Sequence, residues 1–232
     1  MKQTMMPALA LALFLPGAVQ AALVLEKEPN NTLAAAQAVD GHFTLDFSAD
    51  IGNGTHVDNT STTIPHVTVR GSGDGTFDYY SFYFPGPGST SGFVVLDIDH
   101  SSSAFDSHVA LWAANGDGLG HNDDYDFRGG AGGSVPKPTG GPDSFDSLMT
   151  TYLPTAGTYI VGVGRYAASP TTGGYEEGFS GAKPQAGDFY TLQISVENVP
   201  VVPEPGSLPM FGLGALAVLG VLRRHKVGLC VH

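Results

Sequence analysis

Glycine and proline interrupt this chain so often that its body cannot be built from long helices. The 232 residues include 32 glycines and 16 prolines, spread without a fixed period. Both residues break helices, and the missing three-residue period excludes collagen. Hydrophobic residues make up 42% of the chain, enough to bury a core, so wholesale disorder is not expected. This composition favours short β-strands joined by turns.

Windows with the length and polarity pattern of strands recur along the central part of the chain. They are residues 43–47, 67–69, 77–84, 93–98, 109–113, 148–153, 158–163 and 189–196. Gly- and Asn-rich turn signals separate them. Residues 32–39 alone have a short helical pattern, and the Gly/Pro-rich residues 128–144 predict a long mobile loop. We therefore predict an all-β fold, an antiparallel sandwich or barrel of about eight strands.

The net charge limits which partners this chain can bind, and the cysteine count limits how its fold can be braced. Its net charge is −12, which repels nucleic acid and anionic lipid and attracts cations. We therefore exclude nucleic-acid binding. The single cysteine, Cys230, lies near the C-terminus, so there is no disulfide framework. For an exported acidic chain, bound calcium is the obvious alternative brace.

The N-terminus has the pattern of a secretory signal peptide. Residues 1–21 combine Lys2, an apolar run over 8–15 and small residues at Val19 and Ala21. We expect signal peptidase to cut after Ala21. The alternative is a buried N-terminal helix.

The C-terminus has a three-part order. A Pro-rich linker over 200–207 precedes a short apolar helix with a basic stop over 208–226, and 227–232 form a tail. The apolar run is shorter than the ~20 residues that span a bilayer comfortably, and the basic cluster would stay in the cytoplasm. The residues that carry the pattern are Pro203, Glu204, Pro205, Arg223 and Arg224.

This order resembles the PEP-CTERM sorting signal of Gram-negative bacteria. The resemblance implies an exosortase that cuts near the Pro-Glu-Pro motif of an inner-membrane-tethered precursor. The product would then reach the cell surface or the extracellular matrix, released or anchored. A simple C-terminal membrane anchor is the alternative, and either interpretation places the body outside the cytoplasm.

Several blocks of residues 22–199 resemble the bacterial pre-peptidase C-terminal (PPC) domain. They are Glu28-Pro29-Asn30-Asn31-Thr32, Asp78-Tyr79-Tyr80-Ser81-Phe82, Asn122-Asp123-Asp124, Gly157-Thr158-Tyr159-Ile160-Val161 and Gly187-Asp188-Phe189-Tyr190. The resemblance implies a jelly-roll-like β-sandwich. In collagen-binding members of that family, acidic and Asn residues of the leading segment and of the strand before D-Y-x-F hold calcium.

Two clusters of oxygen-bearing side chains are candidate calcium sites, because calcium takes six to eight oxygen ligands. The first contains Glu26, Glu28, Asn30 and Asn31, joined by Asp74 and Asp78. The second contains Asn115, Asp117, Asn122, Asp123, Asp124 and Asp126. The alternative is that these residues only bend and cap the backbone in turns.

No catalytic motif stands out. The sequence lacks G-x-S-x-G, H-E-x-x-H and P-loop patterns. His100, His108 and His121 lack the spacing of a zinc site, so we interpret them as scattered surface histidines. We expect a non-enzyme. Because PPC domains usually accompany a peptidase, a secreted hydrolase or peptidase-accessory protein acting on matrix material is the alternative.

Aromatic residues suggest a ligand. Tyr79 and Tyr80 point to opposite faces of one strand, which predicts one inward and one outward ring. Tyr166, Tyr175 and Phe179 flank a Gly-rich loop and could stack on sugar or peptide, or cover an edge of the core. We therefore expect a calcium-stabilised module that binds extracellular polysaccharide or protein. A structural matrix protein without a specific ligand is a further option.

Overall fold

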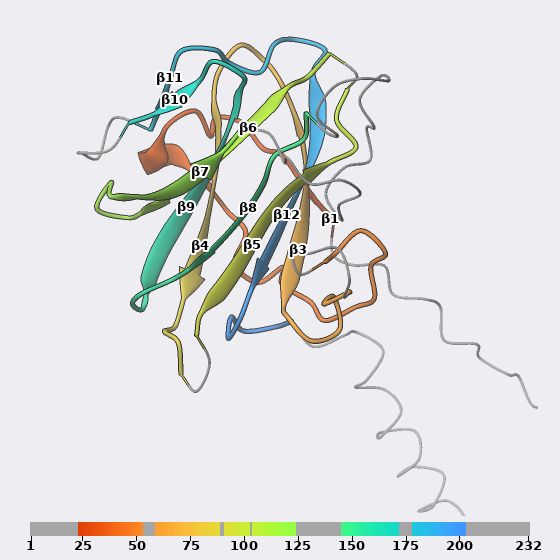
Figure 1. Cartoon of the computed structure of the whole chain (residues 1–232), viewed down its shortest axis with the longest axis vertical. Coiled ribbons are helices and arrows are strands. Elements are labelled where there is room, and N and C mark those ends of the chain that lie inside the picture. The colour runs from red at the N-terminus through yellow and green to blue at the C-terminus, as the bar shows by residue number, and fades with distance from the viewer. Residues whose placement is uncertain are drawn as a thin grey trace, which may run out of the picture. The chain divides into compact units, whose positions relative to one another are not determined.

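The computed structural model describes residues 23–52, 59–88, 91–102, 104–123, 145–171 and 178–202. Within these ranges the chain forms two five-stranded sheets and a two-stranded ribbon (Figure 1). The first sheet has the order β1 (Leu23–Leu25), β3 (His66–Ser72), β12 (Phe189–Val196), β5 (Phe93–Asp99), β8 (Leu148–Tyr152). The second has the order β2 (Gln37–Ala38), β4 (Asp78–Phe84), β9 (Gly157–Arg165), β6 (Ser107–Ala113), β7 (Gly118–Asn122). The ribbon pairs β10 (Ser169–Pro170) with β11 (Phe179–Ser180).

Most of the pairing is antiparallel, which confirms the predicted all-β, sandwich-like class. The two exceptions among the described strands are the parallel pairs β1 with β3 and β2 with β4. Both exceptions come from the N-terminal segment, which adds an edge strand to the first sheet and then one to the second. The residues between β1 and β2 therefore pass from one sheet to the other.

The main core lies between the two sheets and follows the period-2 alternation of their strands. In β12 the inward side chains are Tyr190, Leu192, Ile194 and Val196, all fully buried. In β4 they are Tyr80, Phe82 and Phe84, also fully buried. Burying each such side chain stabilises the fold by about 1.5–3 kcal/mol.

A second apolar cluster covers the opposite face of the second sheet. Its members include Tyr79, Trp112 and Ile160 from the sheet, and Leu33 and Phe179 from the segments above it. Trp112 Nε1 donates to the Thr171 carbonyl at 3.0 Å, and the Tyr79 hydroxyl accepts from the Phe179 amide at 2.7 Å. The second sheet is therefore buried on both faces where this cluster lies, whereas Tyr83 of β4 and His121 of β7 are exposed.

This second cluster corrects the prediction for the aromatic residues. Tyr79 and Tyr80 do point to opposite faces, but both are buried, so the expected outward ring is wrong. Phe179 is also buried and covers the core edge rather than a ligand surface. Tyr166 is exposed, and Tyr175 lies outside the described residues.

Other local predictions differ from the structure in detail. Residues 43–47 form no strand, only the isolated bridge between Thr44 and His66. The helical pattern over 32–39 gives one 3₁₀ turn, η1 (Leu33–Ala35), before β2. The predicted loop over 128–144 lies outside the described residues, as does the apolar helix over 208–226. Among the residues that are described, none belongs to a helix long and apolar enough to cross a membrane.

Candidate metal centre

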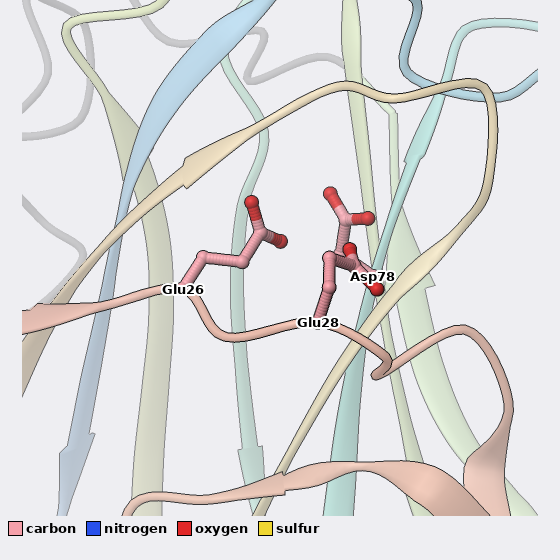
Figure 2. A group of neighbouring side chains, drawn as sticks. All are labelled: Glu26, Glu28 and Asp78. Carbon is pink, nitrogen blue, oxygen red and sulfur yellow. The ribbon is translucent and has the colours of Figure 1, made fainter.

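The segment after β1 places two glutamates over the start of β4. The Glu26 amide donates to the Arg70 carbonyl of β3 at 3.0 Å, which prolongs the β1–β3 pairing by one residue. The Tyr79 amide of β4 donates to the Asn30 carbonyl at 3.0 Å. These two bonds fix the segment to one strand of each sheet. Glu26 and Glu28 consequently face Asp78, the first residue of β4 (Figure 2).

The three carboxylates are close enough to share one cation. One oxygen from each of Glu26, Glu28 and Asp78 lies within 4.8 Å of the others. Ligands on opposite sides of a calcium ion lie about 4.6–5.2 Å apart, because each Ca–O distance is about 2.3–2.6 Å. Three negative charges at this distance repel one another unless a cation or a proton intervenes.

A row of hydroxyl groups links two of these carboxylates through the core. The Tyr80 hydroxyl donates to Glu26 Oε1 at 2.8 Å, and the Tyr190 hydroxyl donates to Asp78 Oδ2 at 2.7 Å. The two hydroxyl oxygens lie 2.8 Å apart. Glu26 Oε2 also accepts from the Ser72 amide at 2.7 Å. These partners orient Glu26 and Asp78 toward each other.

The protons along this row of hydroxyl groups and carboxylates show where one more proton is needed. Three hydrogen bonds along Glu26–Tyr80–Tyr190–Asp78 need three protons, and the two hydroxyls supply two of them. A protonated Asp78 supplies the third only when the last two bonds reverse, so that Asp78 donates to the Tyr190 hydroxyl and Tyr190 donates to the Tyr80 hydroxyl. Burial, followed by the charge of Glu26, raises the pKa of Asp78 to about 8. Burial also raises the pKa of Glu28, partly opposed by the hydrogen bond from the Asn30 amide. The site therefore favours a proton on Asp78. A cation bound by the carboxylates would make this proton unnecessary.

Two fully buried oxygens at this site accept no hydrogen bond from the described residues. They are Asp78 Oδ1 and Asn30 Oδ1, and both residues are 0% exposed. A buried acceptor without a partner costs about 1–3 kcal/mol. Asn30 Nδ2 lies 3.3 Å from Glu26 Oε1, so a half-turn of this amide would place Oδ1 beside Glu26 instead. Carboxylate and amide oxygens are hard ligands, so the donor set fits calcium.

Two other members of the first predicted cluster lie at its margin. Asn31 Oδ1 accepts from the Asn30 amide at 3.3 Å, and so acts on the local backbone. Asp74 is exposed and accepts from the Thr76 amide at 2.8 Å, as expected of a turn residue. Its charge still contributes to the raised pKa values of Glu28 and Asp78.

The second predicted cluster does not come together. Asn115 and Asp117 form a turn between β6 and β7, with the Asp117 amide donating to Asn115 Oδ1 at 3.2 Å. Asn122 is the last residue of β7 and Asp123 follows it, so the five-residue strand separates the two pairs. At about 3.3 Å per residue, that separation is too large for one ion. Asp124 and Asp126 lie outside the described residues.

Sequence reasoning missed the tyrosines of the site. Tyr80 and Tyr190 belong to the buried face of their strands, and their hydroxyls make the only polar contacts of those rings among the described residues. The available signal was a tyrosine at an inward strand position, because a buried hydroxyl usually requires a partner.

Comparison with known proteins identifies the C-terminal segment. Residues 201–224 match the family described as the PEP-CTERM protein-sorting motif, which confirms the predicted sorting signal. None of the curated proteins matches the chain. Among solved structures, the crystal structure of PliG from Aeromonas hydrophila, a periplasmic inhibitor of g-type lysozyme, is 14% identical with a TM-score of 0.32. That alignment covers 58% of this chain and 89% of the inhibitor, and nothing about function follows from so distant a likeness.

The chain therefore combines an all-β, sandwich-like body with a sorting motif at its C-terminus. The motif implies an exported protein whose membrane-anchored precursor is processed by exosortase in a Gram-negative bacterium. The likeness of the body to the PPC domain stays a prediction.

Proposed function

We propose that the body is a non-catalytic, calcium-stabilised module that binds polysaccharide or protein at the cell envelope or in the extracellular matrix. The observation that supports calcium is the group of Glu26, Glu28 and Asp78, whose oxygens lie within 4.8 Å of one another. The buried acceptors Asp78 Oδ1 and Asn30 Oδ1 support it further.

Calcium would act here as a clamp between the sheets. Glu26 continues the strand that pairs with β3, whereas Asp78 begins β4 of the other sheet. An ion bound by both carboxylates would hold the N-terminal crossing segment against each sheet. It would also replace the proton on Asp78 and relieve the repulsion among the three negative charges.

Exposed aromatic rings on the first sheet support a ligand-binding role. Tyr152 of β8 is 59% exposed, and its ring centroid lies 5.4 Å from that of Phe93 on β5. Aromatic residues are enriched at interfaces that recognise a partner, and Phe93 beside Tyr152 is half-buried. A glycan array probed with and without calcium tests this part of the proposal. Binding would support it, and no binding would favour a purely structural matrix protein.

The test of the calcium site is a thermal melt of the full-length protein in mild detergent, with calcium and then with excess chelator. Calcium that binds only the folded state should raise the melting temperature by several degrees at saturating metal. The shift should vanish in Glu26→Gln/Glu28→Gln and in Asp78→Asn.

The calcium-dependent difference matters in this experiment, rather than the melting temperature itself, because removing a buried carboxylate can stabilise the ion-free protein. Asp117→Asn is the matched control, since Asp117 is an exposed acidic residue in the β6–β7 turn. This control should keep the full shift. A wild-type protein that melts identically with calcium and with chelator would exclude the clamp.

A further inference from the structure

Two histidines that lie thirteen residues apart in the sequence meet on neighbouring strands of the second sheet. His108 belongs to β6 and His121 to β7, which pair antiparallel with Ala110 opposite His121. His108 Nε2 lies 3.1 Å from His121 Nδ1, and the ring planes are tilted by 44°. His108 is 5% exposed, so the interpretation of these residues as scattered surface histidines is wrong for this pair.

The separation of the two ring nitrogens suits a shared metal ion as well as a shared proton. Zinc binds imidazole nitrogen at about 2.0–2.1 Å, so two ligands of a tetrahedral ion lie about 3.3 Å apart. The observed 3.1 Å is close to that value. A metal ion could therefore replace the proton between the rings with little movement of either strand.

The surroundings of His108 prepare it as a ligand. Asp123 Oδ1 lies 3.9 Å from His108 Nδ1, the nitrogen on the other side of the ring. At this distance Asp123 makes no hydrogen bond to the ring, but a shift of about 1 Å would let it accept from Nδ1–H, as carboxylates do behind histidine ligands at metal sites. Burial, together with His121, lowers the pKa of His108 to about 4. His108 is therefore neutral at pH 7, and a metal ion has no proton to displace from it.

A cavity of about 500 Å³ adjoins the pair. Both histidines line it, and most of its remaining wall is apolar, including Trp112, Leu119 and Pro170. Two protein ligands leave coordination positions free for water or for a donor atom of a bound molecule. The cavity gives such a molecule room beside the ion.

We propose that His108 and His121 bind a divalent transition-metal ion of the class that prefers imidazole, Zn²⁺ or Cu²⁺, with open coordination positions toward this cavity. The site uses nitrogen ligands on β6 and β7, whereas the calcium cluster uses oxygen ligands on β4 and the N-terminal segment. Hard calcium ions do not compete for imidazole nitrogen. The two proposals therefore stand or fall separately.

The test is a zinc titration of the full-length protein in mild detergent, stripped of metal and then kept in saturating calcium. Isothermal titration calorimetry should detect a zinc equivalent in the wild type that weakens at least tenfold in His121→Gln. His121 is exposed, so this substitution should not disturb folding. His100→Gln is the control, because His100 is 53% exposed and lies 3.3 Å from Asp50, away from the pair. Its zinc binding should equal that of the wild type.

A second readout identifies the ligands. With one equivalent of Cu²⁺, electron paramagnetic resonance should show coupling to two nitrogens in the wild type and to fewer in His121→Gln. Asp123→Asn should bind more weakly than the wild type, about 10–100-fold, without changing the nitrogen count. If the wild type binds no zinc, or if His121→Gln binds as tightly as the wild type, the pair only shares a proton and the proposal is wrong.

Discussion

Asp97 is a deeply buried carboxyl group outside the candidate calcium cluster, and its pKa is strongly raised. It is 3% exposed on β5, and its strand partner on β12 is Gln193, also 3% exposed. Asp97 Oδ1 and Gln193 Oε1 both accept no hydrogen bond from the described residues. Burial first, and then the charges of Asp99, Asp146 and Asp50, raises the pKa of Asp97 well above its usual value. Burial therefore favours the neutral form of Asp97 in the folded protein over its ionised form.

This perturbation predicts a pH-dependent effect of Asp97→Asn. The folded pKa exceeds the unfolded value of about 3.9, so folding takes up a proton and ionisation destabilises the wild type as the pH rises above about 4. Asparagine does not ionise, so the Asp97→Asn variant escapes this loss of stability as the pH rises. The variant should gain free energy of unfolding relative to the wild type by up to about 1.4 kcal/mol for each pH unit.

Urea denaturation at pH 4.5, 6.0 and 7.5 measures this difference. Asp117→Asn serves as the control, because Asp117 is an exposed acidic residue in the β6–β7 turn. A difference between Asp97→Asn and the wild type that stays constant over this range would show that Asp97 ionises normally in the folded state.

At the scale of the element, β3 leaves space for Tyr190, which contacts the candidate calcium cluster. Gly71 of β3 lies opposite Tyr190 of β12. A Cβ atom built on Gly71 would overlap the ring and the hydroxyl of Tyr190. The missing side chain therefore allows Tyr190 to lie across β3 and reach Asp78. One strand position thus determines where a hydroxyl of a neighbouring strand can lie.

Gly71→Ala should consequently affect both stability and calcium. The ring of Tyr190 must move, and overpacking of this kind destabilises a protein by about 1–3 kcal/mol. Because the hydroxyl moves with the ring, the calcium-induced rise in melting temperature should also shrink. Thermal melts with calcium and with chelator measure both effects.

Gly157→Ala is the matched control. Gly157 begins β9, and a Cβ atom there would meet no atom within 4 Å. This variant should melt within a degree or two of the wild type and keep the calcium shift. If Gly71→Ala behaved in the same way, Tyr190 would not depend on the space over β3.

At the scale of the whole molecule, the sorting motif determines which parts of the chain remain together after export. The body ends on β12, and the matched motif begins at residue 201, only a few residues later. Processing near Pro203, Glu204 and Pro205 would therefore separate the apolar segment from the sandwich without cutting a described strand. The mature body would keep both candidate metal sites.

Replacement of the motif should stop this processing. Pro203→Ala/Glu204→Gln/Pro205→Ala should leave an uncleaved precursor in the membrane fraction, because the sequence read by the enzyme is gone. Intact-protein mass spectrometry of membrane and extracellular fractions measures the C-terminus directly. Pro200→Ala, just before the matched residues, should be processed normally. Normal processing of the triple variant would place the recognised sequence elsewhere.

The sequence by itself determined the class of fold and the sorting signal, because both are local properties of the chain. Windows that alternate or run apolar at strand length mark β4, β5, β6, β9 and β12 regardless of their neighbours. The short strands β1, β2, β10 and β11 have too few residues to show a period, so only pairing reveals them.

Only the tertiary structure decided which side chains meet. Glu26, Glu28 and Asp78 are brought together because β1 pairs with β3 while the next segment crosses to β4. His108 and His121 meet through the pairing of β6 with β7, which no local spacing predicts. Likewise, Tyr79 and Tyr80 of β4 are both buried although they point to opposite faces, because Phe179 of β11 and Leu33 of η1 lie over the second sheet. The order of the strands, and which segments cover a sheet, depend on contacts between residues that are distant in sequence. The period-2 pattern shows only which residues share a face.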